Sequence, residues 1–179
     1  MKKILLLIFI CQVFLTVHSQ VYLTRTGFIG FYSKTPFEDI RAENNQVYAA
    51  IDTRNKDIAF VLLMKGFVFT KELMQEHFNE NYAETDKFPK ANFIGKFSGN
   101  ADFSKDGVYP VTVNGNLTIH GISHNIQIPA TLQMKAGKLT GHAQFYIKPE
   151  EFNIRIPSIV RNKIEEKMNI IVDISCTPK

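Results

Sequence analysis

The sequence of 179 residues has only two cysteines, no tryptophan and no block of lysine and arginine. Cys11 lies in an apolar N-terminal segment that we expect to be removed, so Cys176 remains alone and an intrachain disulfide is excluded. Loss of that segment also removes Lys2 and Lys3, which leaves 19 basic against 17 acidic residues and lowers the formal net charge from +4 to +2. A charge this small gives no case for a nucleic-acid partner.

The N-terminus has the pattern of a secretory signal peptide over residues 1–19. Two lysines precede the apolar run Ile4–Val17, and a short side chain, Ser19, stands where a signal peptidase cuts. An uncleaved membrane anchor would need about twenty apolar residues, and this run is too short. We therefore expect cleavage before Gln20, a secreted protein, and a single domain over residues 20–179 with no stable membrane span.

Three consecutive segments alternate between apolar and polar residues with a period of two. They cover residues 111–119, 126–134 and 139–147, and this period is typical of strands with one dry face and one wet face. The short connections at 120–123 and 135–138 contain glycine, which suits hairpin turns. The sequence therefore predicts an antiparallel meander.

Other segments bring the expected total to about eight strands. Alternation continues in 92–103 and 168–174, and apolar runs occupy 47–51 and 58–69. Residues 20–41 contain one or two further strands. The expected fold class is all-β, and about eight antiparallel strands with one apolar face form either a two-layer sandwich or a closed barrel.

A single segment, residues 70–82, changes from strand to helix spacing. Its apolar stripe predicts one amphipathic helix, which would cover an end or a flank of the sheet. The stripe consists of Leu73, Met74, His77, Phe78 and Tyr82.

The apolar phases of the strands predict which side chains share an interior. Thirteen phenylalanines remain after Phe9 and Phe14 leave with the signal peptide, and phenylalanine and methionine without tryptophan suit a lining for a flexible hydrocarbon, although the same rings would also fill a solid core. A one-residue register error at Phe60 would bring Val61 and Leu63 inward instead. The expected lining residues are Phe60, Leu62, Met64, Phe93, Phe97, Phe145, Ile147 and Ile170.

Three motifs in order resemble the YceI-like family, with the match covering about residues 58–174. The first lies between Phe69 and Gly95 and includes His77-Phe78, Glu84-Thr85 and Lys87-Phe88-Pro89; the second is Leu117-Thr118-Ile119-His120-Gly121; the third is Phe152-x-Ile154-x-Ile156-Pro157. The resemblance implies an exported bacterial protein with an extended lipocalin-like antiparallel barrel that binds a polyisoprenoid or other lipid. It implies no cofactor apart from a bound isoprenoid or quinone-like lipid.

The remaining candidates for chemistry are few. His120 and His124 have the spacing of a metal pair on a helix, but Gly121 places them in a predicted hairpin, so we expect no metal site. The sequence has no Gly-x-Ser-x-Gly motif and no phosphate-binding glycine loop. We therefore assign no catalytic residues.

Three functions compete for this sequence. The first is a lipid-binding protein that holds an apolar tail inside the barrel, with His77 among the ligand contacts. The second is a small lipocalin-like hydrolase or isomerase that uses His77 with Glu80 or Glu84 near the barrel mouth. The third is a filled barrel that serves protein contacts. The oligomeric state does not follow from the sequence.

Overall fold

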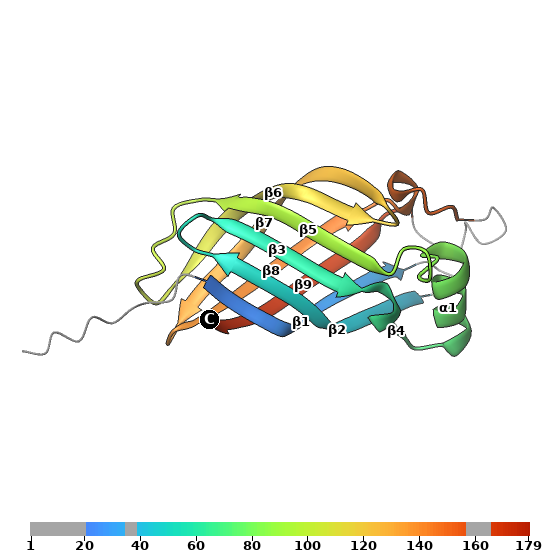
Figure 1. Cartoon of the computed structure of the whole chain (residues 1–179), viewed down its shortest axis with the longest axis horizontal. Coiled ribbons are helices and arrows are strands. Elements are labelled where there is room, and N and C mark those ends of the chain that lie inside the picture. The colour runs from blue at the N-terminus through green and yellow to red at the C-terminus, as the bar shows by residue number, and fades with distance from the viewer. Residues whose placement is uncertain (1–20, 35–38, 157–165) are drawn as a thin grey trace, which may run out of the picture.

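The computed structural model describes residues 21–34, 39–156 and 166–179 (Figure 1). The predicted signal peptide and its cleavage after Ser19 therefore lie outside the described residues, as does Pro157 at the end of the third motif. No helix in the described ranges is long and apolar enough to cross a membrane.

Eight antiparallel strands form a closed barrel, which confirms the predicted fold class and excludes the sandwich. Their order is β1-β9-β8-β7-β6-β5-β3-β2, and β2 pairs with β1 to close the ring, while the short β4 pairs only with β2. The strands are β1 (Val21–Lys34), β2 (Asp39–Asp52), β3 (Asp57–Leu63), β4 (Val68–Phe69), β5 (Lys90–Ser98), β6 (Gly107–Ile119), β7 (Ile122–Lys135), β8 (Lys138–Ile147) and β9 (Met168–Pro178).

The predicted hairpins of the meander are present as two-residue turns. His120 and Gly121 connect β6 to β7 with φ angles of 51° and 75°, and Ala136 and Gly137 connect β7 to β8 with φ angles of 49° and 76°. Two consecutive residues in the left-handed region are typical of the turn type that matches strand twist, and glycine adopts this region without strain. The turns thereby set the register of both hairpins.

The expected strand over 58–69 is interrupted. β3 ends at Leu63, and a 3-10 turn, Met64–Gly66, precedes β4. The buried Asn44 side chain explains the break, because it donates to the Leu63 carbonyl at 3.0 Å and accepts from the Gln46 N–H at 2.8 Å. A Cβ at Gly66 would lie 2.7 Å from Asn44 Nδ2, so the turn needs glycine there.

The expected helix over 70–82 is present but shorter and mixed. α1 (Glu72–His77) continues directly into a π-helical turn, Phe78–Tyr82. The Ala83 N–H donates to the Phe78 carbonyl at 2.8 Å, five residues back, which is the bond of a π turn. α1 lies at one end of the barrel beside β4 (Figure 1).

The opposite end of the barrel is filled. Ile51, Phe97 and Leu139 belong to one buried cluster there, together with Cys176, whose thiol pKa is raised to about 11 by burial. Cys176 is therefore a protonated core residue at neutral pH. The two described chain ends meet at this filled end, where the Lys179 N–H donates to the Val21 carbonyl at 2.9 Å.

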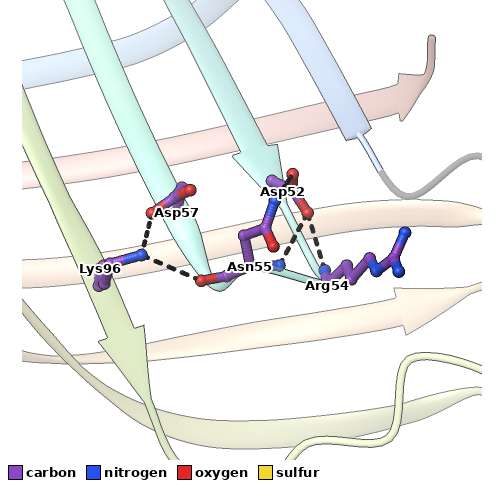
Figure 2. A network of polar contacts seen from close by, with 5 residues as sticks. All are labelled: Asp52, Arg54, Asn55, Asp57 and Lys96. Carbon is purple, nitrogen blue, oxygen red and sulfur yellow. Dashed lines mark hydrogen bonds and ion pairs between the residues drawn. The ribbon is translucent and has the colours of Figure 1, made fainter.

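A polar network closes the β2–β3 turn at the same end (Figure 2). Asp52 Oδ1 accepts from the backbone N–H groups of Asn55 at 3.0 Å and Arg54 at 2.8 Å, and Lys96 from β5 binds the Asn55 carbonyl at 3.2 Å and forms an ion pair with Asp57. The N–H of Asn55, followed by that of Arg54, lowers the pKa of the Asp52 carboxyl below its ordinary value. The charged carboxylate therefore stabilises the folded turn.

This network predicts a pH-dependent stability difference for Asp52→Asn. Because the folded pKa of Asp52 lies below its ordinary value of 3.8, its charged form adds stability above that pH and loses it as the pH falls through the folded pKa. We expect Asp52→Asn to unfold at a lower temperature than the parent at pH 7 and the difference to close in strong acid. Thermal unfolding monitored by circular dichroism measures this. The exposed Asp39→Asn is the control, and a gap that stays constant with pH would contradict the assignment.

Candidate functional site

The α1 half of the barrel contains a cavity of about 590 Å³. Its wall is almost entirely apolar and has residues from all nine strands, with the helical segment and the residues after β8 completing it. The structure brings most of the predicted interior residues together around this cavity. The wall includes Phe60, Leu62, Met64, Phe93, Phe145, Ile147 and Ile170, and His77 lies at its rim.

Phe97 is the predicted lining residue that the structure places elsewhere. It faces the barrel interior as its strand phase requires, but it is only 2% exposed and packs edge-on against Phe103 at a ring distance of 5.8 Å in the filled end. Alternation in the sequence indicates on which face of a strand a residue lies, but not how far along the barrel axis that residue lies. Phe97 is therefore part of the barrel floor and not of the cavity wall.

The register of β3 places Phe60 on the cavity. Phe60 pairs with Phe93 of β5, and both side chains contribute to the wall. Val61 also contributes, whereas Leu63 is 53% exposed. The strand that is apolar in both phases thus presents Phe60 inward, as predicted.

Four phenylalanines close the cavity at the α1 end. Phe31 from β1 lies at the centre of this aromatic cluster, with ring distances of 5.1 Å to Phe67, 5.7 Å to Phe69 and 5.5 Å to Phe78. Edge and tilted contacts of this kind add to the apolar burial that holds α1 against the strands. Phe31 and Phe67 were not identified from the sequence, because β1 and the 3-10 turn lack regular alternation.

Three of the five polar side chains of the wall belong to the helical segment or directly precede it. Lys71, His77 and Tyr82 contribute to the rim there, whereas Asn92 and His142 come from β5 and β8. Burial raises the pKa of the Tyr82 phenol, which keeps it protonated. His77 itself is exposed. An apolar molecule with one polar end would find its hydrogen-bonding partners here.

His120 connects the three sequence motifs. Its Nε2 lies 3.0 Å from Glu84 Oε2 in the first motif, and its Nδ1 lies 3.2 Å from the Phe152 carbonyl in the third. Both partners are hydrogen-bond acceptors, so the imidazole ring bridges two segments that are distant in the sequence. Lys87, and then His120, hold the pKa of the Glu84 carboxyl below its ordinary value. The ring of Phe88 packs on His120 at 4.2 Å.

His124 makes a separate contact with the 3-10 turn η3 (Pro149–Phe152). Its Nε2 lies 2.7 Å from the Glu151 carbonyl, and its ring meets the Phe152 ring edge-on at 5.1 Å. Asn153 ends the turn in the left-handed region with φ of 57°. The two histidines thus bind neighbouring carbonyls of one turn, and the described residues contain no group of three or more side chains able to hold a metal ion.

Two carboxylates were predicted to work with His77 in the enzyme hypothesis, Glu80 and Glu84. Glu84 contacts Lys87 and His120, while His77 stands at the exposed rim. Glu80 is exposed on the π-helical turn three residues after His77. The arrangement supports a structural role for Glu84.

We expect His120→Ala to lower the free energy of unfolding by about 1–3 kcal/mol, because the buried Phe152 carbonyl loses its hydrogen-bond partner. His142→Ala is the matched control, since His142 also binds a carboxylate, Asp173 at 2.7 Å, but its side chain is 55% exposed. That change should remain within about 0.5 kcal/mol. Denaturant unfolding measures both, and equal losses would contradict the role of His120.

Several solved structures share this fold. A polyisoprenoid-binding domain from Saccharophagus degradans implicated in plant cell wall breakdown has a TM-score of 0.75 at 14% identity, covering 90% of this chain and 99% of its own. BcnA of Burkholderia cenocepacia has a TM-score of 0.69 at 14% identity, covering 84% and 96%. The YCEI protein of Campylobacter jejuni has a TM-score of 0.58 at 15% identity, covering 88% and 84%.

Among curated proteins, none matches the sequence significantly. The family model of the YceI-like domain matches residues 15–176, which is most of the chain. The match spans all nine strands and the three motifs joined by His120. The chain therefore belongs to the YceI-like family.

Proposed function

We propose that this protein binds an apolar lipid, with the tail of an isoprenoid or quinone-like molecule inside the barrel cavity. The observation that carries the proposal is the cavity itself, which has about 590 Å³ of space, an almost entirely apolar wall and a group of polar side chains at its rim. Cavities that hold small molecules have volumes of roughly 300–1,000 Å³ and walls of this composition. The filled end provides a floor, so the tail would lie along the barrel axis.

The energetics favour a long flexible tail. Each methylene group that leaves water contributes about 0.8 kcal/mol. Affinity should therefore rise with chain length until the cavity is full, while the polar head contributes selectivity at the rim near Lys71, His77 and Tyr82. The binding of a polyisoprenoid by the similar domain from Saccharophagus degradans supports this class of ligand.

We also propose that the protein is exported and that it is not an enzyme. Residues 1–19 have the pattern of a cleaved signal peptide, which would deliver the barrel to the periplasm or the exterior. An extracytoplasmic carrier of this kind requires no cofactor. The contacts of Glu84 with Lys87 and His120 favour binding over an enzyme that uses His77.

Native mass spectrometry after incubation with a polyprenol and with a ubiquinone tests the proposal. The parent protein should retain one apolar molecule, and Phe145→Asp should weaken retention by about a hundredfold or more, because an unpaired charge would face the apolar wall. Ile94→Asp is the control, since Ile94 of β5 is 66% exposed. Circular dichroism verifies that both variants fold. Parent protein that stays empty with both lipids, or equal losses in the two variants, would overturn the proposal.

A further inference from the structure

The seam between β7 and β8 is hydrogen-bonded over only half of its length. Paired residues run from Lys135↔Lys138 to Ala130↔Ala143 and then stop. Both strands continue, as Ile122–Pro129 of β7 and Gln144–Ile147 of β8. These stretches remain paired on their outer sides, with β6 and β9 respectively. In the described residues, two strand edges therefore face each other without a ladder between them.

The sequence explains where the ladder ends. Lys135 and Lys138 flank the two-residue turn between β7 and β8 and form a hydrogen-bonded pair. Such pairs recur at every second residue along antiparallel strands. Pro129 falls in this series, at a position whose N–H would donate to β8. Proline has no N–H, so the ladder loses a bond at the step after Ala130↔Ala143.

The space between the two edges, which we name the β7–β8 slot, leads into the cavity. Ile126 and Ile128 on the β7 edge and Phe145 and Ile147 on the β8 edge all belong to the cavity wall. The shorter gap between β2 and β3 is different, because the Asn44 amide bridges it by binding the Leu63 carbonyl. The β7–β8 slot has no such polar bridge among the described side chains.

The turn η3 and the residues after it cover the slot from the rim side. Pro149, Phe152, Ile154 and Ile156 contribute apolar side chains to the cavity wall. Two side chains of the β6–β7 hairpin region, His120 and His124, bind carbonyls of η3. This part of the wall is held by side-chain contacts, which can open without breaking a strand ladder.

We propose that the β7–β8 slot is the passage through which the apolar tail moves sideways into the cavity, an inference that rests on the proposed function. Movement from the α1 end would have to separate Phe31 from the three phenylalanine rings packed against it. Movement through the slot breaks no strand ladder between the described residues of β7 and β8, and the backbone groups of Gln127 and Gln144 that face the slot can bind water or the polar head meanwhile. A long tail can then enter along its whole length, without threading.

A reversible cross-link across the slot tests this passage. Gln127→Cys and Tyr146→Cys place thiols at positions that would be opposite if the ladder continued from Ala130↔Ala143. Gln133→Cys with Thr140→Cys is the matched control, because these residues are already paired in the same seam. Both pairs are made with Cys11→Ser, and buried Cys176 stays inert to the thiol-specific reducible cross-linker. Native mass spectrometry follows exchange of bound polyprenol for a deuterium-labelled polyprenol.

We expect the cross-link at 127 and 146 to slow exchange by about tenfold or more, a reductant to restore the rate, and the control cross-link to change it less than about twofold. If the reduced protein binds polyprenol but exchange is the same with and without the cross-link, the slot is not the passage, although lipid binding stands. If the reduced protein binds no polyprenol, the proposed function itself fails. Equal slowing by both cross-links would also overturn the passage, because it would reflect general stiffening.

Discussion

The pairing of β1 with β2 is the constraint on which the rest of the structure depends. It removes the last two free edges of the sheet, so each wall is supported by its neighbours and the centre need not be filled. A sandwich of the same strands would bring its two apolar faces into contact and leave no internal space. Because the sheet is closed, the apolar residues that alternate along its strands surround an internal cavity. Phe97 and its neighbours form the floor of that cavity.

The sequence predicted those features that depend on neighbours in the chain. Alternation identified the strands and the inward phase of Phe93, Phe145 and Ile170, and the glycines at 121 and 137 located the hairpins. It did not predict depth along the axis, which is why Phe97 was assigned to the cavity, nor the break after Leu63. That break depends on Asn44, which is nineteen residues earlier in the chain, and no local pattern reports such a contact.

His120 shows the same limit at the candidate site. Its spacing to His124 suggested a metal pair, which the hairpin argument rejected, but the actual partners are 36 and 32 residues away at Glu84 and Phe152. The signal that could have found this contact is the order of the three motifs, since each contributes one group to it. A family motif whose residues form no catalytic site can therefore mark the place where segments distant in the sequence contact each other.

Val21 and Lys179 meet at the filled end, and this position determines which end of the barrel would face an attached surface or domain. In Figure 1 the C-terminus and α1 stand at opposite ends of the long axis. A linker fused after Lys179, to a bead, a sensor surface or a second domain, would attach the molecule at its filled end. Immobilised copies would then direct α1 and the polar rim away from the surface and toward the solution.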